Sequence, residues 1–128
     1  MRSVDTNVLV RLLVADDAAQ TAAAEAFLAA GRPSWVSTVV LVETVWVLAA
    51  VYGWRKPQLL AMLETATTSK DLGFQSVDVV RAALALYRAS RADFADCLAL
   101  ELAREDGHLP FATFEKATAK LPGVVVPR

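Results

Sequence analysis

The chain has 128 residues, a formal net charge of −1 at pH 7, and a hydrophobic content of 55%. A chain of this length fits one domain that buries about two thirds of its unfolded surface, so we expect a single domain over residues 1–128. The small net charge excludes a general electrostatic attraction to nucleic acid. Any nucleic-acid chemistry would therefore need a local cationic rim or a bound metal.

The high hydrophobic content raises the question of a membrane protein, and the distribution of charges argues against it. The longest apolar stretch, residues 35–52, carries Glu43 near its middle, and placing this carboxylate in the centre of a bilayer would cost free energy. The N-terminus does not resemble a signal peptide, because Asp5 and Asn7 interrupt it, and the only cysteine, Cys97, cannot form an internal disulfide. We expect a cytoplasmic protein whose surplus apolar residues are buried in a core or in a protein interface.

Short apolar runs alternate with longer stretches of helical periodicity, which is typical of strands and crossover helices around a parallel sheet. In chain order, the pattern predicts a strand at residues 2–5, helices at 6–14 and 17–30, a strand at 34–37, helices at 38–53 and 57–68, a strand at 72–76, helices at 77–90 and 94–106, a strand at 109–112, a short helix at 114–120 and a strand at 124–126. Gly53 and Gly107 stand where a helix commonly ends in a left-handed residue. The expected fold is α/β, with a central parallel sheet of about five strands flanked by helices.

Several acidic residues fall where ligands gather in such folds, at the carboxyl ends of strands and in the first turns of the helices that follow. They are Asp5, Glu43, Asp93, Asp96 and Glu115. Carboxylates that lie close together repel each other unless a cation neutralises them. Oxygen ligands without clustered His or Cys select Mg²⁺ or Mn²⁺ over Zn²⁺, and His108 is the only histidine. The pattern favours a site for a hard divalent cation.

Each of these carboxylates also has a structural interpretation. Asp5 and Asp93 are suited to capping helices, with Asp96 in the first turn of the second helix, and Glu115 is ordinary in a first turn. Glu43 differs, because a carboxylate isolated among valines and leucines is poorly placed for a solvated face and, when buried, needs a partner or a metal.

Four blocks follow one another along the chain: VDTNVLVRLL, VSTVVLVETVWVL, ADFADCLALELAREDG and PFATFEKATAKLPGV. In this order and spacing they resemble PIN-domain ribonucleases, and in length and motif order the VapC toxins of bacterial type II toxin–antitoxin pairs. The resemblance covers essentially the whole chain. It implies a PIN domain that cleaves RNA with Mg²⁺ or Mn²⁺, forms a homodimer, and binds a cognate antitoxin that blocks the site.

By the same resemblance, Asp5, Glu43 and Asp96 bind the metal and catalyse phosphodiester hydrolysis, with Asp93 as a further candidate. The final family motif usually reads Thr-Phe-Asp, whereas this chain has Glu115 at the acidic position. The longer side chain keeps the charge and extends the reach by one methylene, so a second metal would be held less tightly or at a different distance. The implied mechanism is metal-assisted attack of a water on the phosphate.

Other residues near these motifs are candidates for binding or orienting the substrate. Asn7 and Thr113 match polar positions of the family. Arg11 and Lys116 are candidate phosphate contacts, and three aromatic residues could stack on RNA bases: Trp46, Trp54 and Phe94. The alternative for Arg11 and Lys116 is that they are solvated surface charges. Trp46 is expected to lie in the core. The helices at 38–53 and 57–68 carry more apolar residues than a monomer should expose, which suits the implied partners.

Two other functions stay open on the sequence. One is a degenerate PIN module that binds RNA or antitoxin without cutting, an interpretation supported by Glu115. The other is a haloacid-dehalogenase-like phosphatase with Asp5 as the nucleophile. That family needs a second aspartate where this chain has Asn7.

Overall fold

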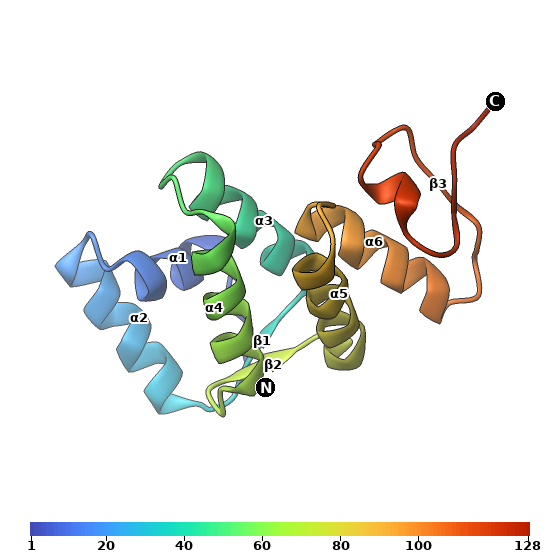
Figure 1. Cartoon of the computed structure of the whole chain (residues 1–128). Coiled ribbons are helices and arrows are strands. Elements are labelled where there is room, and N and C mark those ends of the chain that lie inside the picture. The colour runs from blue at the N-terminus through green and yellow to red at the C-terminus, as the bar shows by residue number, and fades with distance from the viewer. The chain divides into compact units, whose positions relative to one another are not determined.

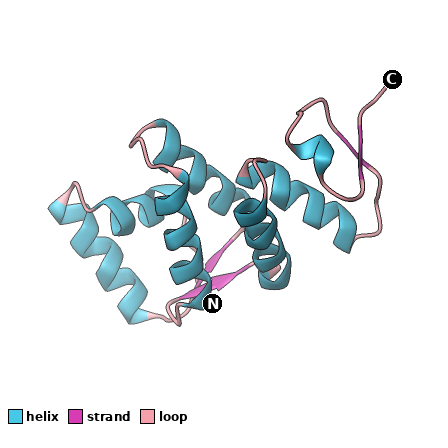
Figure 2. Cartoon of the chain, viewed as in Figure 1, coloured by secondary structure: helices cyan, strands magenta, loops and turns pink.

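The computed structural model describes all 128 residues, and they form two compact units, Met1–Val77 and Asp78–Arg128, here called unit 1 and unit 2. Helices account for most of both units, and the strands are short (Figure 2). None of the helices has the length and apolar character that a membrane crossing requires.

Unit 1 contains four helices and two strands (Figure 1). In chain order these are α1 (Thr6–Val14), α2 (Ala18–Ala30), β1 (Ser34–Val36), α3 (Thr38–Ala50), α4 (Lys56–Thr68) and β2 (Leu72–Phe74). β1 and β2 are parallel, with Ser34 opposite Leu72 and Val36 opposite Phe74. Ser3 adds to the same sheet by a single parallel bridge to Trp35.

Unit 2 is built on two helices followed by a compact C-terminal segment. Its elements are α5 (Val77–Ala89, whose first residue closes unit 1), α6 (Phe94–Glu105), β3 (Phe111–Ala112), the 3₁₀ turn η1 (Thr118–Lys120) and β4 (Val124–Val125). β3 and β4 are parallel, with Phe111 opposite Val124. Arg104 of α6 holds the loop before β4, because its Nη2 donates to the Pro122 carbonyl oxygen at 2.9 Å.

Capping side chains start the helices at the expected places. Asp5, Asp17, Ser37 and Asp93 are N-caps, and each accepts a hydrogen bond from a backbone N–H in the first turn of its helix. Gly53 and Gly107 have φ angles of 69° and 77°, in the left-handed region predicted for them. The helices from α1 to α6 accordingly begin and end within three residues of their predicted limits.

The expected central sheet of about five strands is not seen. The structure has two separate two-stranded sheets, and the strand predicted at residues 2–5 contributes only the bridge at Ser3. The strands stay short because a helix or turn follows almost at once: Asp5 and Ser37 already cap helices, and Ser76 after β2 has a φ of 51°. The helix predicted at 114–120 is likewise reduced to η1.

Each unit has its own buried apolar side chains. In unit 1 the fully buried ones include Val36, Leu41, Leu48 and Leu63. In unit 2 they include Val80, Phe94, Cys97, Leu98 and Leu100. These clusters lie beneath the N-terminal halves of α3 and α6, where Glu43 is on the second turn and Asp96 on the first.

Candidate functional site

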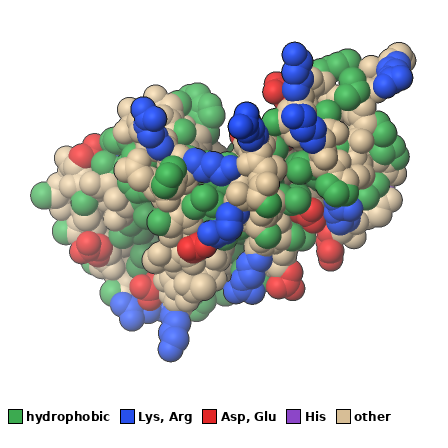
Figure 3. All heavy atoms as spheres, viewed as in Figure 1, with side chains coloured by type: hydrophobic (Ala, Val, Ile, Leu, Met, Phe, Trp, Pro, Cys, Tyr) green, Lys and Arg blue, Asp and Glu red, His purple; other side chains and the backbone are tan.

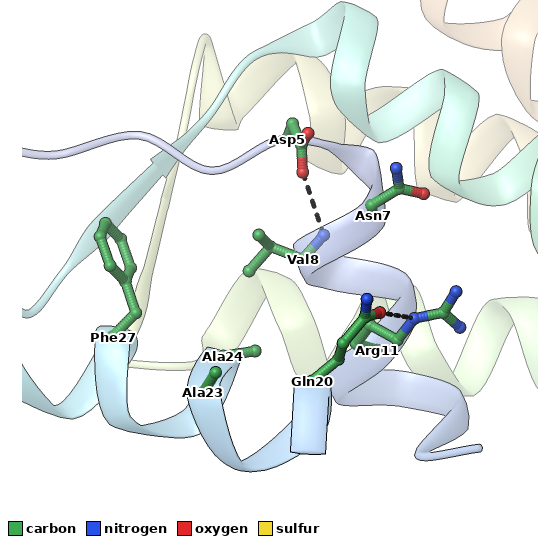
Figure 4. Close-up of a pocket in the computed structure, with 8 residues that line it drawn as sticks. All are labelled: Asp5, Asn7, Val8, Arg11, Gln20, Ala23, Ala24 and Phe27. Carbon is green, nitrogen blue, oxygen red and sulfur yellow. Dashed lines mark hydrogen bonds between the residues drawn. The ribbon is translucent and has the colours of Figure 1, made fainter. Parts of the chain in front are cut away.

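Asp5 is exposed and serves as the N-cap of α1. Its Oδ1 accepts the backbone N–H of Val8 at 3.0 Å, drawn as a dashed line in Figure 4. The structural interpretation of Asp5 is therefore confirmed, and it does not conflict with the chemical one. The capping bond occupies one carboxylate oxygen and leaves Oδ2 for another ligand.

Glu43 lies on the second turn of α3 and is exposed. Its Oε1 accepts a hydrogen bond from the hydroxyl of Thr6, the buried residue that follows Asp5. The expectation that Glu43 is poorly placed for a solvated face was wrong, because the residue is exposed, although it has a hydrogen-bond partner. Through Thr6, unit 1 brings the N-terminus of α1, with Asp5, to the acidic turn of α3.

A pocket of about 390 Å³ lies between α1 and α2 beside Asp5 (Figure 4). Its lining consists of Asp5, Asn7, Val8, Arg11, Gln20, Ala23, Ala24 and Phe27. Apolar side chains of α2 make its floor, and polar ones come mainly from α1 (Figure 4). Asn7 is exposed here, next to the acidic cap, which suits the orienting role predicted for it.

Arg11, predicted to contact phosphate, already has partners within unit 1. Its Nε donates to Gln20 Oε1 at 2.6 Å, and its Nη1 donates to Asp16 Oδ1 at 2.7 Å and to the Tyr52 hydroxyl at 3.2 Å. The hydrogen bond to Tyr52 and the charge of Asp16 raise the pKa of Arg11 above its usual value. The side chain is thus a fixed cation at the pocket, and its role toward phosphate stays a prediction.

Asp93 and Asp96 lie together at the start of α6 in unit 2. Asp93 is the N-cap, and its Oδ1 accepts the backbone N–H of Asp96 at 2.8 Å, which confirms the capping interpretation. Asp96 is half-buried, and its Oδ2 accepts the hydroxyl of Thr118 at 3.0 Å. Burial raises the pKa of the neighbouring Tyr87 phenol, and the charge of Asp93 raises it further.

The last acidic candidate, Glu115, lies in the exposed turn between β3 and η1. Its backbone N–H donates to Thr113 Oγ1 at 3.0 Å, so Thr113 stabilises the turn that carries the carboxylate. The Glu115 carbonyl oxygen accepts the N–H of Ala119 at 2.9 Å. Lys116 follows on the same exposed turn.

The predicted ligands are thus divided between the units, with Asp5 and Glu43 in unit 1 and Asp93, Asp96 and Glu115 in unit 2. Within either unit, no three His, Cys, Asp or Glu side chains are grouped as a metal site. The five-carboxylate metal site therefore stays a prediction.

Two aromatic assignments were wrong. Trp46 is 64% exposed, although its valine-rich surroundings predicted a place in the core. Phe94 is 2% exposed and packs edge-on against Tyr87, with ring centroids 5.8 Å apart, so it is not available to stack on a base. Cys97 is buried and His108 is exposed, as their isolation in the sequence indicated.

Sequence reasoning missed Thr6 and Thr118, the hydroxyl donors to Glu43 and Asp96. The position of Thr6 directly after Asp5 was a usable signal, because the first helical turn carries both side chains. Thr118 had no such signal, since it lies 22 residues from Asp96 in the sequence.

The helices with acidic caps or acidic N-terminal turns, the short parallel strands and the buried cores are consistent with an α/β domain. The PIN domain family matches residues 3–123, so the chain belongs to the PIN domain family. The matched region spans both units. PIN domains are generally metal-dependent nucleases. A search of curated proteins found no match to the chain.

Proposed function

We propose that this chain is a Mg²⁺- or Mn²⁺-dependent endoribonuclease, the VapC-type toxin of a type II toxin–antitoxin pair. The observation that carries the proposal is the PIN family match over residues 3–123. By the resemblance of the sequence blocks, the acidic motif positions correspond to Asp5, Glu43 and Asp96, whose side chains have defined hydrogen-bond partners.

The donor set fits a hard divalent cation. Asp5, Asp93 and Asp96 each accept one hydrogen bond on one carboxylate oxygen, and Glu43 does the same on Oε1. A second oxygen of each group is left for coordination. Mg²⁺ is bound in proteins by a few carboxylates while it keeps several waters, so this set needs no nitrogen or sulfur ligand.

In the proposed mechanism, Asp5, Glu43 and Asp96 would hold the metal, with Asp93 and Glu115 as additional candidate ligands. The bound cation would activate a water and offset charge on the phosphate. Asn7 and Thr113 orient the ligand or water, and Arg11 and Lys116 contact phosphates of single-stranded or looped RNA, whose backbone is accessible.

The proposal is tested by RNA cleavage with the purified protein free of antitoxin. We expect cleavage of single-stranded RNA with Mg²⁺ or Mn²⁺ and none with a chelator. Asp5→Asn and Asp96→Asn should each lower the rate at least about 100-fold, because metal stabilisation is worth several kcal/mol and about 1.4 kcal/mol is tenfold in rate. Asn still caps α1, since its amide oxygen accepts the same N–H, so Asp5→Asn should remain folded.

Asp17→Asn is the matched control. Asp17 caps α2 by accepting the Gln20 N–H at 3.0 Å and is assigned no role in the site. Persistent cleavage by folded Asp5→Asn protein, or an equal loss in Asp17→Asn, would contradict the assignment. A wild-type protein that binds metal and RNA without cutting would instead be a degenerate module.

The proposed toxin role also implies a homodimer, a cognate antitoxin and a cytoplasmic location. Fractionation of expressing cells would test the location. Two features support the protein partners. Val39 and Trp46 of α3 are 76% and 64% exposed, and an apolar groove of about 500 Å³ lies between α1, α2 and α4. Large exposed apolar surfaces of this kind commonly mark protein interfaces.

A further inference from the structure

Two proposed metal ligands share one arrangement: each carboxylate accepts a hydrogen bond from a buried threonine. Thr118 is 1% exposed and donates to Asp96 Oδ2 at 3.0 Å, and Thr6 is 7% exposed and donates to Glu43 Oε1. We propose that Thr118 and Thr6 are positioning residues, which orient Asp96 and Glu43 for the metal. This inference rests on the proposed function, because it concerns the same ligands.

The hydrogen bond fixes the direction of the Thr118 hydroxyl. A buried hydroxyl without a partner costs free energy, and a carboxylate can only accept, so Thr118 must be the donor. The 3.0 Å separation lies within the range of an ordinary O–H···O bond. The β-branched side chain is also restricted at χ1, so few orientations compete with this one.

The two ends of the Asp96 residue are therefore both held. Its backbone N–H donates to Asp93 in the first turn of α6, and its Oδ2 is held by Thr118 from η1. The position of Oδ1 is then set before a cation arrives, and less side-chain freedom is lost on binding. Hydrogen-bond partners of metal ligands commonly change metal affinity or activity about 10- to 100-fold when they are removed.

The unit 1 arrangement is equivalent but comes from different elements. Thr6 is the first residue of α1, and its hydroxyl reaches across to Glu43 on α3. Glu43 is longer than aspartate and exposed, so it would otherwise sample several side-chain conformations. The hydrogen bond from Thr6 restricts this freedom next to the capping residue Asp5.

The experiment compares Thr118→Val, which keeps the shape and removes the hydroxyl, with Thr118→Ser, which keeps the hydroxyl. Mn²⁺ affinity is measured by calorimetry without RNA, and stability is measured by urea unfolding. We expect Thr118→Val to bind Mn²⁺ about 10- to 100-fold more weakly and Thr118→Ser to recover most of the affinity. In cleavage assays kcat should fall while KM for RNA stays unchanged, because the buried Thr118 is not accessible to the substrate.

Thr67→Val is the matched control. Thr67 is also buried, 8% exposed, but its hydroxyl donates to the Leu63 backbone carbonyl at 2.8 Å. This variant should change stability without changing Mn²⁺ affinity. An equal loss of affinity in Thr67→Val would overturn the proposal, because the effect would then come from general destabilisation.

The outcomes separate this inference from the proposed function. Wild-type Mn²⁺ affinity in folded Thr118→Val protein overturns the positioning role and leaves the nuclease assignment intact. A wild-type protein that neither binds Mn²⁺ nor cuts RNA overturns both. Should Thr118→Val fail to fold, Thr6→Val decides by the same Mn²⁺ measurement, with Thr6→Ser as its conservative partner.

Discussion

Four of the candidate carboxylates, Asp5, Glu43, Asp93 and Asp96, accept a hydrogen bond on one oxygen and leave another oxygen for chemistry. Asp5 Oδ1 caps α1 by accepting a hydrogen bond from the Val8 nitrogen at 3.0 Å, and Asp93 Oδ1 caps α6 by accepting one from the Asp96 nitrogen at 2.8 Å. Capping and metal binding are therefore compatible roles for the same carboxylate. A substitution that keeps the cap, such as aspartate to asparagine, isolates the charge from the fold.

Gly123 offers a test of backbone conformation at a single residue. Its φ is 84°, and a Cβ atom there would lie 3.1 Å from Leu109 Cδ1. Left-handed conformations cost a residue with a side chain about 1–2 kcal/mol, so Gly123→Ala should lower the free energy of unfolding by at least that amount. Urea unfolding measures the change.

Gly107→Ala is the comparison, because Gly107 has a similar φ of 77° and a Cβ there would meet nothing within 4 Å. Both variants should lose stability because alanine disfavours a left-handed backbone. Only Gly123→Ala should lose more, through the close contact with Leu109. Equal losses would show that the Leu109 side chain moves aside without cost. A Gly123→Ala protein as stable as the wild type would contradict the expectation that the left-handed conformation at residue 123 is costly for alanine.

The sequence correctly predicted that Asp5 and Asp93 cap helices, but it did not always predict which side chains are exposed to solvent. Caps depend on a side chain and on backbone N–H groups three residues away, so the sequence carries the information locally. Exposure depends on which other element covers a helix face. Trp46 was therefore expected in the core and is exposed, and the partner of Asp96 was not predicted because Thr118 lies in a distant turn.

At the level of elements, helices were predicted closely and strands were not. Helix limits follow from caps, glycines and periodicity within one segment, and all six helices from α1 to α6 were located. Strand lengths depend on pairing between distant segments. The first predicted strand, residues 2–5, has Val4 as its one apolar residue. Asp5 already caps α1, and only Ser3 bridges to β1.

The exposed face of α3 predicts self-association. Val39 and Trp46 are seven residues apart, which places them on one side of the helix, and both are largely exposed. Hydrophobic side chains are visible at the surface among the charged ones (Figure 3). We expect the wild-type protein to be a dimer of the 13.8 kDa chain and Trp46→Glu to be a monomer, measured by gel filtration with light scattering.

Val126→Glu provides the control for this prediction. Val126 is also exposed, at 44%, but lies in the C-terminal segment outside the helices. The same charge introduced there should leave the dimer intact. A wild-type protein that is monomeric at micromolar concentration, or a Trp46→Glu protein that still dimerises, would show that α3 is not the interface.

At the scale of the whole molecule, one family match covers two compact units. Each unit supplies part of the proposed ligand set and its own hydroxyl donor, Thr6 in unit 1 and Thr118 in unit 2. The order of the acidic motifs in the sequence was enough to identify the family. The distances among carboxylates that a metal requires are a property of packing, which motif order does not specify.

The groove between α1, α2 and α4 is proposed to bind the antitoxin. It is lined mainly by apolar side chains, among them Leu12, Leu13, Leu28, Trp54 and Met62. An apolar segment of a partner would bury this surface, and burial of apolar area is the main favourable term in such contacts. Expression of the chain alone should arrest growth, and co-expression of the small protein encoded by the adjacent gene should restore it.

Ala61→Arg tests where that inhibitor binds, because Ala61 is an exposed residue of α4 that lines the groove. The arginine should occupy the groove without disturbing the core, so RNA cleavage should persist while inhibition by the antitoxin is lost. Ala26→Arg places the same side chain on an exposed position of α2 outside the groove and should be inhibited as the wild type is. Because both variants carry the same added charge, a difference between them reports on the groove and not on electrostatics. Full inhibition of Ala61→Arg would place the antitoxin on another surface.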